Sequence, residues 1–350
     1  MPSFALTRLF TAVLAALPLV FTAPHPSPHN RCDAAASVYR FQEQVWIENL
    51  RVRSNGNVLT TRYDNFPRLY EFNPKDHHPL PRLLAEFPEY DNSKSLSGIA
   101  EYKPDVFAFL AGPSHYDLTA HALDLLDGTT DIWTIDLNVE DPRAQKLTSF
   151  QSGFANGISH VPGTPYGLVS DSTFGIVYRV NLDTGVVEKV VEDPLLHYPA
   201  SAVLHIGING IQLNEEGTIV YFANSQGFMG SFPIDPQTGL KTGDIKVLAR
   251  LDGTVFDDFA VGKKALYITG DPEGEVFRLD LATNEITAIF GKPAPSHILP
   301  GATAAQLGRT RSTKEKLYLT YNGGLTVLPY NASFVIPGGL TVVDLAVLHA

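Results

Sequence analysis

Six short segments of the sequence share one pattern, in which a position for a polar side chain stands among apolar residues. They span 47–50, 96–99, 155–158, 208–211, 256–259 and 303–306. The second position of the pattern holds Glu48, Ser97, Asn156, Asn209, Asp257 and Ala304. Four of these side chains are strong oxygen donors, and hard oxygen ligands without a thiolate are what Ca²⁺ prefers. The pattern therefore predicts a divalent-metal site made by Glu48, Asn156, Asn209 and Asp257, with magnesium or manganese as second choices and zinc disfavoured.

The Asn-Gly pairs at 156 and 209 also have a simpler interpretation. Asn tolerates left-handed backbone geometry, so either pair taken alone is typical of an ordinary turn. The equal register of oxygen donors in four repeats favours the metal site instead. At the fourth position of the set, either Asp257 or Asp258 is a candidate ligand. The register selects Asp257, and we expect Asp258 to bond to the backbone or to orient its neighbour.

A second set of polar side chains follows the β-rich runs of the chain. It comprises His115, Tyr116, Asp171, Ser172, Asn224, Ser225, Asp271, Tyr321 and Asn322. These residues are candidates for the rim of the same pocket, although Asp171-Ser172 and Asn224-Ser225 are better explained as caps of turns at strand ends. His115 is a candidate general base beside a metal-bound water, against the alternative of a surface or hydrogen-bonded histidine. Nucleophile elbows, phosphate loops and zinc-protease motifs are absent from the sequence.

The elements that must position these side chains are six β-rich runs. They begin at residues 57, 105, 165, 219, 265 and 316 and are therefore 46 to 60 residues apart. This period is typical of one four-stranded propeller blade per repeat. We expect each run to be the inner strand of its blade. The patterned segment precedes each run, and equivalent positions lie at equivalent heights around a propeller axis. We predict an all-β, six-bladed propeller with four-stranded antiparallel blades, closed by residues 37–41 and 340–345 sharing the last blade.

Composition sets the remaining expectations. The 350 residues contain no linker-like tract, so we expect one propeller domain over residues 24–350. A net charge of −11 without a basic cluster argues against nucleic-acid binding. The apolar run at residues 9–23 predicts a signal peptide over residues 1–23 and entry into the secretory pathway, not a membrane span. Cys32 is the single cysteine, so an intrachain disulfide is impossible, and Asn331 is the one N-glycosylation candidate.

The spacing of Glu48, Asn156-Gly157, Asn209-Gly210 and Asp257 resembles the senescence-marker-protein and gluconolactonase-like superfamily, over roughly residues 37 to 345. That resemblance implies a calcium or similar ion at the propeller centre, held by these four residues. The segments at 45–49, 53–56, 257–259 and 303–309 are most similar to a fungal branch that serves secondary metabolism. This branch includes hetero-Diels–Alderases, which join an ortho-quinone methide to a humulene-type alkene in tropolonic sesquiterpenoid pathways.

Three functions follow from these observations. The resemblance implies a cyclase that holds two apolar reactants in a reactive geometry, with Tyr116 or Tyr321 packing on the terpenoid. The four oxygen donors indicate instead a metal-dependent lactonase or esterase, in which Asp257 or His115 assists proton transfer. A binding or chaperone-like propeller with a structural metal ranks last. In each case the expected partner is a small molecule, with no membrane and no nucleic acid.

Overall fold

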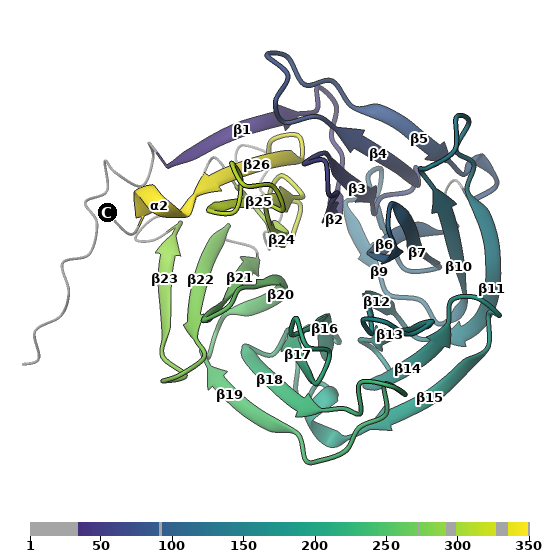
Figure 1. Cartoon of the computed structure of the whole chain (residues 1–350), viewed down its shortest axis with the longest axis vertical. Helices are drawn as coiled ribbons and strands as arrows, with labels where there is room; N and C mark the ends of the chain where they lie inside the picture. The colour runs from purple at the N-terminus through teal and green to yellow at the C-terminus, as the bar shows by residue number, and fades with distance from the viewer. Residues whose placement is uncertain (1–33, 91–92, 272–273, 292–298, 327–334, 349–350) are drawn as a thin grey trace, which may run out of the picture.

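A computed structural model describes residues 34–90, 93–271, 274–291, 299–326 and 335–348. Six four-stranded antiparallel sheets are arranged in a ring around a common axis, as Figure 1 shows. The six innermost strands each pack against the innermost strands of the two neighbouring sheets, so the ring is closed. The prediction of an all-β, six-bladed propeller is confirmed. The predicted signal peptide, Cys32 and the glycosylation candidate Asn331 lie outside the described residues.

The blades follow the chain in order, and the first three are formed by the N-terminal half. Blade 1 contains β2 (Ile47–Val52), β3 (Val58–Arg62), β4 (Arg68–Phe72) and β5 (Arg82–Glu86). Blade 2 contains β6 (Ser95–Lys103), β7 (Val106–Gly112), β10 (Gly128–Asp136) and β11 (Gln145–Ser152). Blade 3 contains β12 (Ala155–His160), β13 (Tyr166–Asp171), β14 (Ile176–Asn181) and β15 (Val187–Glu192).

The C-terminal half forms the other three blades. Blade 4 contains β16 (Ile208–Leu213), β17 (Ile219–Asn224), β18 (Phe228–Pro233) and β19 (Lys246–Arg250). Blade 5 contains β20 (Val255–Val261), β21 (Ala265–Asp271), β22 (Glu275–Asp280) and β23 (Ile286–Phe290). Blade 6 contains β24 (Ala302–Leu307), β25 (Lys316–Tyr321), β26 (Gly339–Asp344) and β1 (Ala35–Arg40).

The remaining elements are short. A hairpin of β8 (His115–Asp117) and β9 (Ala122–Asp124) is inserted in blade 2, and η1 (Pro88–Tyr90), η2 (Pro194–Leu196) and α2 (Leu345–Leu348) lie between or after blades. A membrane-crossing helix is not found among the described residues, whose one α-helix has four residues. Pairing of β1 with β26 closes the ring from the two ends of the chain, as the sequence predicts for residues 37–41 and 340–345.

The β-rich runs of the sequence are the second strands of the blades, and the patterned segments are the innermost strands themselves. We expected the runs to be innermost, and that expectation is wrong. Second strands such as β3 and β7 are rich in β-forming residues and are buried almost throughout, because neighbouring blades cover both of their faces. Innermost strands carry polar side chains toward the axis and contain an irregularity, which hides them from a search for continuous β-rich runs.

That irregularity is a β-bulge, which recurs in all six innermost strands at the patterned segment. The pairing register shifts by one residue between Ile47 and Leu50 of β2, and at the corresponding place in the other five strands. A bulge changes the direction of a side chain relative to a regular strand. The repeated bulge therefore gives the second position of each segment a distinct direction at the axis.

Hydroxyl groups link these bulges around the ring. Thr61 donates to the carbonyl oxygen of Ser97 at 2.7 Å, Ser170 to that of Asn209 at 2.5 Å, and Thr320 to that of Glu48 at 3.0 Å. In blade 5 the corresponding donor is Thr269, which bonds to the carbonyl of Thr303 at 3.0 Å. Thr303, and not the predicted Ala304, is thus the structural equivalent of Glu48 in blade 6.

Candidate functional site

The four predicted oxygen donors lie at equivalent bulges, near the start of innermost strands β2, β12, β16 and β20. Glu48, Asn156, Asn209 and Asp257 are all buried, with 3–7% of their surface exposed. Charge repulsion couples Glu48 to Asp257, and the Asn209 amide interacts with the Asp257 carboxylate. The structure therefore brings Glu48, Asn209 and Asp257 together, and it places Asn156 at the same height on blade 3. These four residues are called the axial quartet below.

Both carboxyl groups of the quartet are hard to ionise. Burial raises the pKa of Glu48 to about 8, against the hydrogen bond from the Trp46 indole, and the nearby Asp271 and Asp258 raise it further. Burial and then the charge of Glu48 raise the pKa of Asp257 well above its usual range. Two buried carboxylates at close range require either protons or a cation to balance them.

The acceptor atoms of the quartet suit a cation. Asn209 Nδ2 donates to Ser225 Oγ at 3.0 Å, while its buried Oδ1 has no hydrogen-bond partner among the described residues. An unpaired buried carbonyl oxygen beside two carboxylates is the donor set of a hard divalent ion. A group of three or more His, Cys, Asp or Glu side chains placed to hold a metal does not occur in the described part of the chain. The quartet has only two such residues and completes its set with amides.

An aromatic layer covers the quartet at this end of the axis. The Trp46 ring packs at a tilt against Tyr63 and Tyr116, with 5.4 and 5.2 Å between ring centroids, and the Tyr63 ring lies 5.5 Å from that of Phe154. Ile206 and Leu325 complete the same buried cluster. We call these six residues, Trp46, Tyr63, Tyr116, Phe154, Ile206 and Leu325, the aromatic cap. The layer is amphipathic, because Trp46 packs in it while its indole nitrogen donates to Glu48.

Tyr63 brings a hydroxyl group into the cap, and the carboxyl groups of the quartet act on it electrostatically. Burial, followed by the charges of Glu48 and Asp257, raises its pKa well above 10.0. Ser114 lies near enough to lower that pKa, yet among the described residues the buried Tyr63 hydroxyl has no hydrogen-bond partner of normal geometry. Sequence reasoning missed Trp46, Tyr63 and Phe154. A usable signal was present, since Trp46 and Phe154 each stand two residues before a quartet residue.

The three predicted catalytic candidates occupy different environments. Tyr116 is in the aromatic cap, and its hydroxyl donates to the Leu325 carbonyl at 3.4 Å. His115 is buried, with Nδ1 3.0 Å from the Pro113 carbonyl oxygen. Tyr321 lies apart from both, because its hydroxyl accepts a bond from Arg40 of the outermost strand β1 and its ring belongs to the apolar cluster shared by blades 5 and 6. Tyr321 is the last residue of the second strand β25 and not part of an innermost strand, which explains this.

A polar network fills the axis beneath the quartet. Asp258 accepts bonds from the backbone N–H of Phe259 at 2.7 Å and from Asn49 Nδ2 at 2.9 Å, and Gln212 approaches it at 3.3 Å. The bond to Phe259 confirms the expected backbone role of Asp258. Burial raises its pKa, while these bonds lower it. Arg51 donates in turn to Gln212 at 3.4 Å, across the axis from blade 1 to blade 4.

The turn-cap interpretation of the second polar set is confirmed for Asp171 and Asn224, but it is wrong for Ser172 and Ser225, whose hydroxyls donate to the carbonyls of Ile208 and Phe256 in the next blade. Asp171 accepts bonds from the N–H groups of Gly153 and Phe154 at 2.8 and 3.0 Å, and Asn224 Oδ1 accepts from Gln226 at 2.9 Å. These side chains cap turns at the ends of second strands. Their contribution to a site is therefore indirect, since Asp171 fixes the backbone that presents Phe154 to the aromatic cap.

Comparison with known proteins agrees with this architecture. No protein-family model matches the chain. It is 26% identical to a protein of Sarocladium schorii named "Putative hetero-Diels-Alderase asR5", over 93% of this chain and 86% of that one. It is 25% identical to a Phoma sp. protein named "Putative hetero-Diels-Alderase", over 93% of this chain and 99% of that one.

Two solved structures show the same fold at low identity. Regucalcin of Agrobacterium tumefaciens, a calcium-binding protein, is 15% identical with a TM-score of 0.57, over 87% of this chain and 91% of that one. The allergen Mala s 1 of Malassezia sympodialis is 12% identical with a TM-score of 0.60, over 85% and 92% of the two chains. The chain is thus a six-bladed propeller with regucalcin-like architecture, similar over nearly its whole length to proteins named as hetero-Diels–Alderases.

Proposed function

We propose that this protein is a small-molecule cyclase of the hetero-Diels–Alderase type, acting in fungal secondary metabolism. The observation that carries the proposal is the pairing of the aromatic cap with the axial quartet. A mainly apolar layer contributed by several blades lies against the buried polar groups of the quartet. Within the described part of the chain, the Tyr63 hydroxyl of this layer and Asn209 Oδ1 of the quartet have no hydrogen-bond partner. An amphipathic electrophile has one end suited to each half of such a site.

The reaction proposed is the addition of an ortho-quinone methide to an alkene of a humulene-type terpenoid, as in tropolonic sesquiterpenoid pathways. The conjugated C=C–C=O unit of the quinone methide and the alkene form one C–C and one C–O bond, and no atom leaves. The Tyr63 hydroxyl is placed to donate to the carbonyl oxygen, which makes the quinone methide a better acceptor of the alkene electrons. Trp46, Tyr116 and Phe154 hold the hydrocarbon and exclude water from the electrophile.

The quartet fits a hard divalent cation held by Glu48, Asn156, Asn209 and Asp257, and its all-oxygen donor set suits Ca²⁺ best. Such an ion supplies Lewis-acid polarisation of a carbonyl group and balances the two buried carboxylates. The same donor set favours a second candidate, a calcium-dependent lactonase or esterase. In that case Trp46 and Tyr63 bind and orient the lactone instead of a quinone methide.

A chelator experiment separates the two candidates. Purified protein, with and without chelator, is given a panel of lactones and, separately, a generated quinone methide with humulene alcohol, and products are followed by chiral chromatography. The cyclase predicts stereoselective adduct, reduced roughly 10- to 100-fold by Tyr63→Phe if one hydrogen bond to the carbonyl is lost. Tyr178→Phe, in the outer part of blade 3, is the matched control and leaves the rate unchanged. Chelator-sensitive lactone opening without adduct would reject the cyclase.

We also propose that the chain enters the secretory pathway, because residues 9–23 form the apolar core of a signal peptide. Expression in a fungal host followed by N-terminal sequencing of the product in the medium tests this. Recovery of protein that begins after residue 23 is the expected result. Product retained in the cytosol with residues 1–23 intact would contradict it.

A further inference from the structure

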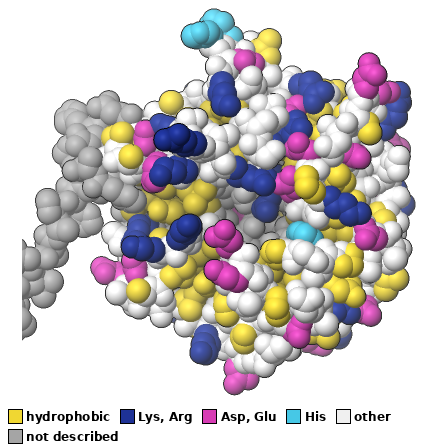
Figure 2. Space-filling model, in the orientation of Figure 1, with side chains coloured by type: hydrophobic (Ala, Val, Ile, Leu, Met, Phe, Trp, Pro, Cys, Tyr) yellow, Lys and Arg dark blue, Asp and Glu magenta, His cyan; other side chains and the backbone are white. Residues whose placement is uncertain are grey.

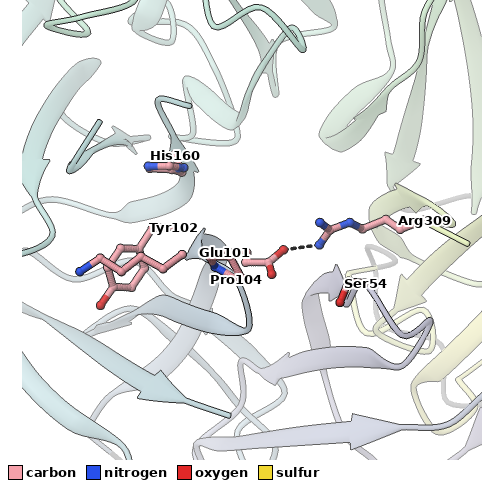
Figure 3. A pocket seen from close by; sticks show the side chains of 7 residues that line it. Ser54, Glu101, Tyr102, Pro104, His160 and Arg309 are labelled. Atoms are coloured by element: carbon pink, nitrogen blue, oxygen red, sulfur yellow. Dashed lines mark hydrogen bonds and ion pairs between the residues drawn. The ribbon is translucent and has the colours of Figure 1, made fainter. Parts of the chain in front are cut away.

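The axial quartet lies on the propeller axis, so a ligand has two ends from which to approach it. At one end, where the innermost strands finish, a cavity of about 240 Å³ opens, and Figure 3 shows Glu101 and Arg309 meeting across it. Figure 2 shows this face, with basic and acidic side chains gathered around its centre. Along blade 1 the order is Glu48 of the quartet, then Arg51 of the polar network, then Ser54 at the cavity. The polar network therefore separates this cavity from the quartet.

At the other end, the aromatic cap closes the axis. Its six members have only 1–6% of their surface exposed. A ligand that reaches the quartet from this end must pass between these side chains, so a segment over the cap has to move. Three segments cover it, and they contribute the partly buried residues Leu118, Leu123, Leu125, Leu204 and Val335.

Two of these segments are fastened by side chains that bond to their backbone. Gln226 Nε2 donates to the carbonyl oxygens of Leu204 and Ile206, at 3.0 and 2.8 Å. Asn322 Oδ1 accepts the backbone N–H of Leu325 at 3.1 Å. Such bonds to buried backbone groups are costly to break. The third segment, the β8–β9 hairpin, is therefore the best candidate for movement.

The hairpin stands outside the six blades and is amphipathic. β8 and β9 have three residues each and form a two-stranded sheet of their own. Tyr116 lies opposite Leu123 in this sheet, and Leu118 and Leu125 continue the same face because side chains alternate along a strand. All four pack on or within the cap, whereas residues 119–121 at the tip are exposed. Figure 1 shows β9 toward the centre of the ring.

Hydrogen bonds fix the base of the hairpin. Ser95 Oγ donates to the Ser114 carbonyl at 2.5 Å, and Ser114 Oγ accepts the N–H of Leu126 at 2.9 Å. Beside this base, the Tyr116 N–H donates to the Tyr63 carbonyl at 3.1 Å. The leucine face beyond it is held by apolar contact, which has no directional requirement. Because an isolated two-stranded hairpin is at best marginally stable in water, this contact is what keeps the hairpin closed.

We propose that the β8–β9 hairpin is a lid over the aromatic cap, and that Leu118, Leu123 and Leu125 on its underside bind the apolar part of a ligand. Opening uncovers this leucine face opposite Trp46 and Phe154, a combination that suits a neutral hydrocarbon skeleton. Closure excludes water from the quartet. The proposal deepens the function proposed above and rests on it for the identity of the reactants, but movement of the lid is measurable without any reaction.

Trp46 is an internal probe of this movement. The chain has two tryptophans, and the other, Trp133, lies against Phe87 in the outer part of blade 2. In a Trp133→Phe background, quenching of the fluorescence by acrylamide reports how often Trp46 meets solvent. Leu123→Ala is expected to raise the quenching constant several-fold, because a smaller apolar contact holds the lid closed. The matched control Leu248→Ala removes a partly buried leucine of β19 and leaves quenching unchanged.

The neutral dye N-phenyl-1-naphthylamine, which accepts energy from excited tryptophan, serves as the ligand probe. Saturable binding that quenches Trp46 emission is expected, and Leu118→Ala is expected to weaken this binding several-fold. Hydrogen exchange of the wild type, followed by mass spectrometry, covers the case in which a leucine variant fails to fold. Amides of residues 117–124 are expected to exchange faster than those of the β17–β18 hairpin, and the dye is expected to slow them.

Each part of the proposal has a result that overturns it. Equal quenching in Leu123→Ala and Leu248→Ala, or lid amides that exchange as slowly as those of β17–β18, overturns the lid. Dye binding that leaves Trp46 emission unchanged, or that Leu118→Ala does not weaken, overturns the leucine face as a binding surface. Absence of cycloadduct in a protein whose lid behaves as expected rejects the proposed reaction and leaves the lid standing.

Discussion

Replacing Thr61 by Val is expected to destabilise the ring that carries the quartet, whereas the same change at the adjacent Thr60 is not. Both side chains are fully buried in β3. The Thr61 hydroxyl accepts the N–H of Asn49 at 3.1 Å and donates to the carbonyl of Ser97 at 2.7 Å. The Thr60 hydroxyl has no hydrogen-bond partner among the described residues. Val has nearly the shape of Thr, so the pair isolates the hydroxyl group.

The magnitude follows from the groups left behind. Thr61→Val leaves a backbone donor in blade 1 and a backbone acceptor in blade 2 without this partner, at about 1–2 kcal/mol each, so about 2–4 kcal/mol together. Thr60→Val exchanges an unsatisfied buried hydroxyl for a methyl group and is expected to be neutral or to stabilise by about 1 kcal/mol. For a chain of this size, about 2 °C in Tm corresponds to each kcal/mol.

Thermal unfolding followed by circular dichroism measures the difference. We expect Thr61→Val to lower Tm by about 4–8 °C relative to the wild type, and Thr60→Val to leave it unchanged or raised. Equal losses in the two variants would refute the reasoning, because the cost would then come from the shape change and not from the hydrogen bonds. A Thr61→Ser variant, which retains the hydroxyl, is expected to recover most of the loss.

Three further predictions concern charge, backbone and metal. Burial raises the pKa of Asp131, but its hydrogen bonds, first that of Lys94, outweigh this and lower it to about 2. Because the pKa is lower in the folded than in the unfolded state, Asp131 stabilises the fold by about 1–2 kcal/mol above pH 4, and this stabilisation is lost as the pH falls toward 2. The free energies of unfolding of Asp131→Asn and the wild type, measured in urea, should therefore converge in acid. Gly227→Ala should lower the free energy of unfolding by at least about 1 kcal/mol more than Gly253→Ala in the same assay. Both glycines have positive φ, but a Cβ at Gly227 would meet the Leu251 carbonyl oxygen at 2.5 Å, whereas a Cβ at Gly253 would face open space. Ca²⁺ should raise the Tm of the wild type by several degrees, and a chelator should reverse this increase. Asp257→Asn should lack the response, and in chelator it should be no less stable than the wild type. A full response to Ca²⁺ in that variant would contradict the metal site.

Much of the architecture was predictable from the sequence. The blade period and the closure by residues 37–41 and 340–345 depend on strand-length apolar patterns, which local burial imposes on the chain directly. The equal register of Glu48, Asn156, Asn209 and Asp257 was likewise readable, because repeats place equivalent residues at equivalent heights.

Tertiary structure alone decided which strands face the axis. Second strands are buried on both faces and rich in β-forming residues, so they are the easiest to find, whereas the bulged innermost strands, where the quartet lies, carry mixed patterns. The bulge also moved the blade 6 equivalent from Ala304 to Thr303, a one-residue shift that depends on pairing with β25. Packing across blades assembled the aromatic cap and removed Tyr321 from it, since such contacts join residues remote in sequence. The sequence therefore determined the period and the chemical types, and the closed ring determined which of them meet.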